Sequence, residues 1–445
     1  MTEKPFAAPE LSTEEQAREI LKSEQFFRLF LDALRRERLV GEERNALVLY
    51  IVALSSLLDD PLNAIIKGAS SAGKNFLAKN VLRFFPDDAI REITSSSDMA
   101  WNYIEDNCEH KVIYLQERNE AAGNIHPVRL LISDKKLVRQ VKVGKTVQDF
   151  VTNGPISSIS TTTRNVLEID DESRHISLWT DQSPEQTLRI AVRSVARYLP
   201  QDDAEQGPLS DQELAAWQQV YSLIRQRAKR PVTLAAWFKV VAKRINTGSV
   251  VSRRYFPAFI EACRTIALIR SFESVSEWEP GRVEVSFEDF CIAAILFEDV
   301  FVASLQRGSD DDLNTATAVQ EISERDGEIG ADAEALAAHL NISTDRAYRM
   351  LRDALDAGAI VRANGPEKAN AKLYIRTPQA RFLPRPEDLL GEISEIPSPV
   401  QFIHPLTGDL TSLVRKIGSP EKPAASELAG RKTPRSNPRP RKKYR

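Results

Sequence analysis

Residues 68–75 have the sequence Gly-Ala-Ser-Ser-Ala-Gly-Lys-Asn, a glycine-rich loop with a lysine directly after its last glycine. The segment before it, residues 62–67, is short and mostly apolar, which predicts a buried strand. The segment after it, residues 75–85, has apolar residues at helical spacing and ends before Pro86, which predicts a helix. A strand, a glycine loop and a helix in this order indicate a phosphate site, because loop N–H groups and the helix N-terminus face the anion.

This loop supplies the candidate nucleotide-binding residues. Lys74 would neutralise the terminal phosphates of ATP, and Asn75 occupies the position where Ser or Thr usually ligates Mg²⁺. The residues predicted to bind the nucleotide are Gly68, Ser70, Ser71, Ala72, Gly73, Lys74, Asn75 and Phe76. Because an amide oxygen ligates Mg²⁺ more weakly than a carboxylate, the motif predicts ATP binding and leaves efficient hydrolysis open.

Composition narrows the class of protein. The chain has 445 residues, which suggests two to three domains, and its 42% hydrophobic and 28% charged residues are typical of a globular protein. The net charge of −3 provides no general basic field, so any nucleic-acid surface must be local. Three distant cysteines and five scattered histidines give no metal-ligand spacing and suggest reduced thiols in a cytoplasmic protein. The longest apolar stretch, residues 46–58, is too short to span a bilayer.

The pattern of apolar residues changes along the chain and predicts five parts. Residues 1–60 have helical periodicity, and residues 61–185 alternate short strands with helices, which predicts an α/β core with a parallel sheet. Residues 186–308 return to helical periodicity and would form a lid. A small domain is predicted over residues 313–385, and a proline-rich, extended and disordered basic tail over residues 386–445.

A second candidate element is the strand Lys-Val-Ile-Tyr-Leu at residues 111–115, which is followed by Gln116 and Glu117. Nucleotide hydrolases of this type place a Mg²⁺-binding Asp at such a strand end, and an adjacent Glu orients the attacking water. Here Gln116 takes the first position and Glu117 the second, so Glu117 is the candidate for water activation. The predicted metal site comprises Asn75, Gln116 and Glu117. The alternative is that Glu117 is a surface residue after a core strand.

Two more positions follow further along the chain. Residues 156–163 are β-prone and end in a run of hydroxyls, so Thr162 or Thr163 is a candidate sensor of the γ-phosphate; a plain Thr-rich strand end is the alternative. Arg174 precedes another apolar strand and could reach the nucleotide of a neighbouring subunit, because a guanidinium is always charged and forks onto phosphate oxygens. A turn salt bridge with Asp171 or Glu172 would explain Arg174 equally well.

The order of these elements resembles the P-loop AAA+ ATPases, most closely helicase-type proteins of phages, plasmids and integrative elements that are distant relatives of the minichromosome maintenance helicases. The resemblance covers roughly residues 40–300 and rests on residues 68–74, 112–117, 160–163, 172–174 and 181–187. It implies an AAA+ core with a helical lid, ATP and Mg²⁺ as cofactors, and DNA as the substrate. Together with Arg174, it implies a homo-oligomer, expected to be a hexameric ring, and a primase as a possible partner.

The resemblance also implies two further sites. Residues 135–152 are predicted to form a β-hairpin that turns at residues 143–145, and such helicases push a hairpin at this position into the DNA channel, with Lys142 and Lys145 as contacts. An ordinary hairpin with solvated lysines is the alternative. Arg253 or Arg254, at the start of a lid helix, would contact the nucleotide.

The C-terminal region has the layout of a winged helix. Helices are predicted over residues 333–340 and 344–357, followed by strands over residues 360–362 and 372–376. Basic residues on the second helix and in the wing are the predicted DNA contacts: Arg346, Arg349, Arg352 and Lys372. A protein-binding winged helix is the alternative. Residues 431–445 contain eight basic and no acidic residues and could grip phosphates without sequence preference.

The sequence therefore predicts an ATP-dependent, DNA-acting motor that is helicase-like or loads a helicase. A nucleotide switch that binds DNA or a partner with weak or no hydrolysis is the alternative, because neutral amides replace the usual magnesium ligands at Asn75 and Gln116. A transcriptional regulator under ATP control is a third hypothesis.

Overall fold

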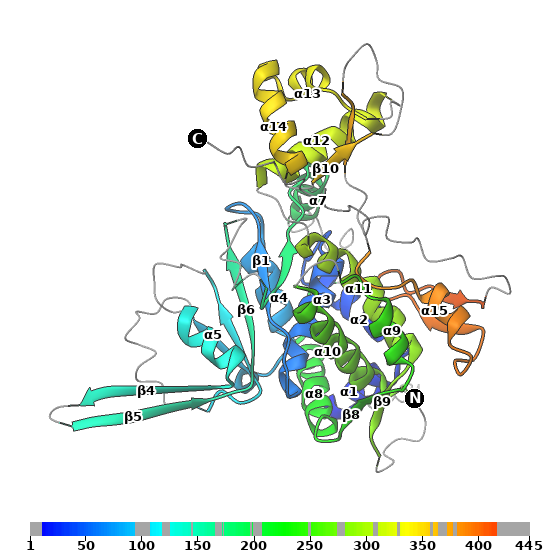
Figure 1. The fold of residues 1–445 in the computed structure, drawn as a ribbon. Helices are drawn as coiled ribbons and strands as arrows, with labels where there is room; N and C mark the ends of the chain where they lie inside the picture. The colour runs from blue at the N-terminus through cyan, green and yellow to red at the C-terminus, as the bar shows by residue number, and fades with distance from the viewer. Residues whose placement is uncertain are drawn as a thin grey trace, which may run out of the picture.

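A five-stranded parallel sheet forms the centre of the structure, which is a computed structural model (Figure 1). In spatial order its strands are β2 (Ile90–Ile93), β3 (Lys111–Leu115), β6 (Ile156–Thr162), β1 (Ala64–Lys67) and β7 (Ile176–Trp179). All four neighbouring pairs run parallel. Every residue of β1 and β6 is buried, as expected for central strands of a sheet covered on both faces. The predicted α/β core with a parallel sheet is confirmed.

The structure describes most of the chain, with several gaps. The described residues are 11–93, 107–117, 125–143, 146–164, 171, 173–195, 198, 207–247, 251–273, 281–305, 310–326, 330–356, 359–363, 372–376 and 381–415. Within them, no helix is both long and apolar enough to cross a membrane.

Helices cover the two faces of the sheet unequally. Val112 packs into a large helical core, whereas its neighbour Ile113 packs into a smaller one, because successive side chains of a strand point to opposite faces. The small core is closed by α5 (Ile125–Ser133) and the base of a hairpin formed by β4 (Lys136–Val143) and β5 (Thr146–Asn153). The hairpin projects away from the sheet (Figure 1).

The large core belongs to a helical body on the other face. Its elements are α1 (Thr13–Lys22), α2 (Phe26–Arg36), α3 (Glu43–Leu54), α4 (Lys74–Leu82), α8 (Asp211–Arg227), α9 (Phe238–Arg244), α10 (Ser252–Arg270) and α11 (Phe287–Leu305), with the strand pair β8 (Val232–Leu234) and β9 (Val283–Val285). One further helix, α7 (Pro184–Val195), follows β7 and is mostly exposed.

The N-terminal segment and the predicted lid share this core with the sheet. Phe30 of α2 lies with its ring centroid 5.7 Å from that of Trp217 in α8, and both rings contact Phe84, at 4.9 and 5.4 Å. In their described parts, residues 1–60 are helical and residues 186–308 are mostly helical apart from the short strands β8 and β9, but neither segment forms a core of its own. Packing between distant segments decides this, and apolar periodicity in either segment carries no information about its partner.

An ion pair ties these two segments together at the surface. Arg36 donates to both carboxylate oxygens of Glu213, at 2.5 and 2.9 Å, and Glu213 also caps α8 by accepting from the backbone N–H of Ser210. The hydrogen bond from Arg36 is the main reason that the pKa of Glu213 is lowered from its ordinary 4.5 to about 2.

Replacing Glu213 should therefore destabilise the fold only where its carboxylate is charged. A carboxyl whose pKa is lower in the folded than in the unfolded state stabilises the fold above about pH 4.5, and this contribution is lost as the pH falls toward 2. We expect Glu213→Gln to lower the melting temperature by roughly 1–3 °C at pH 7, because the pair is partly exposed, and to match the wild type near pH 2. Thermal melts between pH 7 and pH 2, with Glu14→Gln in the exposed pair with Arg18 as control, would measure this. An equal difference at every pH would contradict it.

A small module follows α11 and has its own core. It comprises α12 (Asp310–Asp326), α13 (Ala333–Leu340), α14 (Thr344–Asp356), β10 (Ile360–Arg362) and β11 (Tyr374–Arg376). Asp332 caps α13 by accepting from the N–H of Ala335, and Asn341 ends it in the left-handed conformation. The two predicted helices are confirmed to within one residue, and β10 and β11 pair antiparallel.

The predicted extended tail from residue 386 is wrong as far as residue 415. This segment forms α15 (Pro386–Glu392) and the hairpin of β12 (Val400–Ile403) and β13 (Leu410–Leu413), and it packs against α11 (Figure 1). Its few apolar side chains, such as Leu390 and Phe402, are buried in the large core. These side chains are too few to form a periodic apolar pattern in the sequence, so only tertiary contacts account for their burial. The basic stretch at residues 431–445 lies outside the described residues.

Candidate functional site

The glycine loop lies between β1 and α4, at the carboxyl edge of the sheet. Gly73 has φ +78° directly before α4, a left-handed conformation that favours glycine. At Gly68 the limit is space, since a Cβ atom there would lie 2.3 Å from the hydroxyl oxygen of Thr180. Both glycines are therefore needed for the path of the chain. The loop joins strand β1 to helix α4, so the predicted order of strand, loop and helix is confirmed.

Lys74 folds back across this loop. Its ammonium donates to the carbonyl oxygens of Gly68 and Ala69, at 2.8 and 2.6 Å, which uses two of its three N–H groups. Burial lowers the pKa of Lys74, and the nearby Glu117 carboxylate acts in the opposite direction. The structure thus brings together Lys74 and Glu117, two of the residues predicted from the sequence, with Glu117 exposed after the end of β3.

Asn75 faces the tips of β3 and β6. Its side-chain oxygen accepts from the Tyr114 hydroxyl at 3.2 Å and lies 2.9 Å from the Thr161 hydroxyl, which also contacts the carbonyl of Gln116. The Thr161 hydroxyl has a single hydrogen, which is divided between the carbonyl of Gln116 and the side-chain oxygen of Asn75. Through these contacts Asn75 joins α4 to the tips of β3 and β6.

The other predicted metal and sensor residues also have protein partners. The side-chain amide of Gln116 donates to Glu92, which pairs with Lys79 at 3.2 Å. Thr162 is buried, and its hydroxyl oxygen accepts from the backbone N–H of Arg164 at 3.1 Å. Among the threonines at this strand end, it is Thr161, and not the predicted Thr162, whose hydroxyl contacts Asn75. Among the described residues, no group of three His, Cys, Asp or Glu side chains could hold a metal ion.

A cavity of about 620 Å³ opens beside the loop. Five of the residues predicted to bind the nucleotide line it: Ser70, Ser71, Ala72, Gly73 and Phe76. Its other walls are the connection between α2 and α3, residues 38–42, and the inner side of α7 with Gln186 and Ile190. The cavity is large enough to hold a nucleoside next to a phosphate loop, as sites of this kind measure about 300–1,000 Å³.

Gln186 holds two of these walls together, a role that the sequence does not signal. Its amide donates to the carbonyl oxygen of Val40 at 2.6 Å, and it packs so closely on Gly41 that a Cβ atom there would lie 1.9 Å from its oxygen. Glu42 continues the connection by accepting from the backbone N–H of Asp181 at 2.8 Å. Burial raises the pKa of this Glu42 carboxyl.

Arg174, Arg253 and Arg254 line a second cavity of about 300 Å³. It lies at the amino edge of the sheet, because Arg174 precedes β7 and β7 begins opposite the first residue of β1. The loop follows the other end of β1, and a four-residue strand spans roughly 13 Å. Arg174 donates to the Ser133 hydroxyl at 3.1 Å, and Arg254 donates to the Ser173 hydroxyl. Arg253 and Arg254, one of which is predicted to contact the nucleotide, both line this cavity, and neither lines the cavity of the loop.

The predicted hairpin is present, with its turn between Val143 and Thr146. The side chain of Lys142 and the whole of Lys145 lie outside the described residues, so their proposed contacts stay predictions. One face of the hairpin exposes Val138, Val147 and Val151.

The basic residues of the small module lie at its surface. Arg346, Arg349 and Arg352 are all exposed on α14, beside the exposed ring of Tyr348, and Lys372 is exposed just before β11. Three-residue spacing on a helix brings the three arginines onto one side, as predicted.

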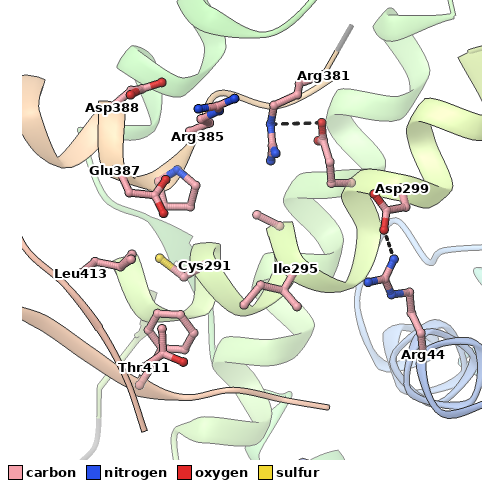
Figure 2. A pocket seen from close by; sticks show the side chains of 14 residues that line it. Arg44, Cys291, Ile295, Asp299, Arg381, Arg385, Glu387, Asp388, Thr411 and Leu413 are labelled. Carbon is pink, nitrogen blue, oxygen red and sulfur yellow. Dashed lines mark hydrogen bonds and ion pairs between the residues drawn. The ribbon is translucent and has the colours of Figure 1, made fainter. Parts of the chain in front are cut away.

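A further cavity of about 630 Å³ separates α11 from the C-terminal segment (Figure 2). Its wall carries charges of both signs, and two ion pairs lie within it: Arg44 contacts Asp299, and Arg381 lies 3.5 Å from Glu298. This mixture does not favour a phosphate, and the cavity is separate from the loop.

Comparison of the sequence with models of known protein families and with curated proteins gives no match.

Proposed function

We propose that this protein is an ATPase of the AAA+ type that acts on DNA, helicase-like or helicase-loading, in a replication system of a mobile element. The observation that carries the proposal is the glycine loop with Lys74, placed between β1 and α4 at the carboxyl edge of a parallel sheet. Ligands of open α/β sheets bind outside the carboxyl ends of the strands. A cavity of suitable size adjoins the loop.

Within this proposal, residues of one chain bind ATP and prepare the attacking water. The loop N–H groups and the N-terminus of α4 would hold the phosphates, and Lys74 would leave its loop carbonyls to neutralise them. Glu117, exposed and close enough to influence Lys74, would accept a proton from water. Mg²⁺ would offset phosphate charge when bound, held through water by Glu117, since the oxygen of Asn75 already contacts two hydroxyls.

The arginines support an assembly. Arg174 cannot reach the loop of its own chain across the sheet, so it would complete the site of a neighbouring subunit, and Arg253 and Arg254 line the same cavity. Contacts between opposite edges of identical subunits are head-to-tail and close into rings, for which a hexamer is our expectation. A protein that stays monomeric in the presence of ATP and DNA would contradict this part of the proposal.

The small module would provide DNA contacts. Its helix pair α13 and α14 with a two-stranded sheet has the layout of a winged helix, and the exposed arginines of α14 would meet phosphates.

A nucleotide switch with little or no hydrolysis is the second candidate. The contacts of the Asn75 side-chain oxygen with Tyr114 and Thr161 favour the switch, because an oxygen already engaged by hydroxyls is a poorer direct ligand for Mg²⁺. Measuring ATP affinity and DNA-stimulated phosphate release on the same preparation separates the two. Turnover stimulated by DNA supports the motor, tight binding without turnover supports the switch, and no ATP binding contradicts both.

Replacing the arginines of α14 should weaken DNA binding in a salt-dependent way. We expect the triple change of Arg346, Arg349 and Arg352 to alanine to lower affinity about equally for unrelated sequences. The slope of log affinity against log salt should fall by roughly 1 for each lost phosphate contact. Fluorescence anisotropy at several salt concentrations measures it, with Arg225→Ala on α8 as control. An unchanged slope would point to a protein-binding module instead.

A further inference from the structure

The chain that leaves the small module is anchored in the helical body at Phe382. This side chain is fully buried, and its ring centroid lies 5.3 Å from that of Phe301 and 6.4 Å from that of Tyr255. The backbone N–H groups of Phe382 and Leu383 each donate to one carboxylate oxygen of Glu298, at 2.9 Å. Residues 381–383, which we name the strap, are thus held by side-chain packing and by a buried carboxylate at once.

Both ends of the module meet at the same end of α11. The chain passes from α11, which carries Phe301, into the module at Asp310, and it returns from β11 to Phe382 (Figure 1). Four residues, 377–380, separate β11 from residue 381 in the sequence, and a chain spans at most about 3.6 Å per residue, so the distance between the module and the strap has an upper limit. Movement of the module therefore acts on Phe382.

The strap also contacts the start of α10. The backbone N–H of Asn246 donates to the carbonyl of Phe382 at 3.0 Å, and the carbonyl of Asn246 accepts from the Ser252 hydroxyl at 2.8 Å. Ser252 and Tyr255 are buried on this first turn, whereas Arg253 and Arg254 between them are exposed and line the cavity of Arg174. One side of a single helical turn thus packs on the strap, and its other side carries two arginines.

We propose that the strap couples DNA binding by the module to the arginine-bearing turn of α10, with Phe382 and Glu298 as positioning residues. The inference rests on the proposed function, since it takes the module to bind DNA and the arginines to act on a neighbour's nucleotide. Close-packed side chains transmit displacement because they lack free volume to absorb it. DNA on the module repositions Phe382, and Arg253 and Arg254 shift with Tyr255 and Ser252.

The test uses the full-length protein with Phe382→Ala and the milder Glu298→Gln, which keeps one of the two accepting oxygens. Both variants should keep the DNA affinity and the basal turnover of the wild type, and DNA stimulation of turnover should fall about fivefold or more, as expected for a coupling of 1–3 kcal/mol. Phe402→Ala is the matched control, because it removes a buried aromatic ring of the same C-terminal segment from β12, which packs on α11. Full stimulation in both strap variants, or equal loss in the control, overturns the coupling.

Amide hydrogen exchange at residues 251–256, with and without DNA, separates this inference from the proposed function. A DNA-dependent change in the wild type that disappears in both variants supports coupling even if the wild type does not turn over ATP, a result that would refute only the motor. DNA binding without any change at residues 251–256 overturns the coupling even if turnover is normal.

Discussion

Lys74→Ala should abolish DNA-stimulated phosphate release and weaken ATP binding by about 100-fold, the scale expected when one charged group facing a phosphate is lost. The reason is the position of this ammonium, which lies across the carbonyls of Gly68 and Ala69 in the loop that lines the cavity. Titration with a fluorescent ATP analogue and a phosphate-release assay measure the two effects separately.

The matched control is Lys79→Ala on the same helix. Lys79 pairs with Glu92 at 3.2 Å on the exposed side of α4, so its loss removes an equal charge without touching the loop. Both variants should melt at similar temperatures. If Lys74→Ala bound and hydrolysed ATP as well as Lys79→Ala, the loop would not be the nucleotide site and the proposed function would fail.

Arg174→Ala should lower the turnover number by about 10³-fold and leave ATP affinity nearly unchanged, the behaviour of an arginine supplied by a neighbouring subunit. Arg174 lies at the amino edge of the sheet, whereas the loop lies at the carboxyl edge. The decisive measurement mixes two inactive variants. Arg174→Ala retains an intact loop and Lys74→Ala retains an intact Arg174, so random mixing should restore about a quarter of the sites in a ring.

Restoration on mixing requires that the two residues act across a subunit interface. An arginine that served only its own chain would give no activity in any mixture. A purely structural Arg174, which bonds to the Ser133 hydroxyl, would show itself as a lower melting temperature of Arg174→Ala. Arg225→Ala, which removes an exposed pair with Asp88, provides the control for mixing and for stability.

Local patterns were enough to predict much of this site. The strand, loop and helix around Gly68 and Lys74 depend on consecutive residues, and so do the caps that bound α13. Glycine conformations, caps and apolar periodicity act within one or two turns of chain, so the sequence alone displays them. For the same reason the β4–β5 hairpin and the helix α14 with its exposed arginines were predicted correctly.

Contacts across the fold decided the remaining features. Asn75 meets Thr161, 86 positions away, because α4 packs beside the tips of β3 and β6. Arg253 joins Arg174 at the opposite edge from the loop, since the order of the strands and the packing of α10 place them there. Phe382 packs in the large core with α10 and α11, although the sequence predicts it as part of the small domain, and the segment from residue 386 joins the same core, although the sequence predicts an extended tail there. Sequence spacing carries the conformation of each element, whereas the partners of each side chain follow from how the elements pack.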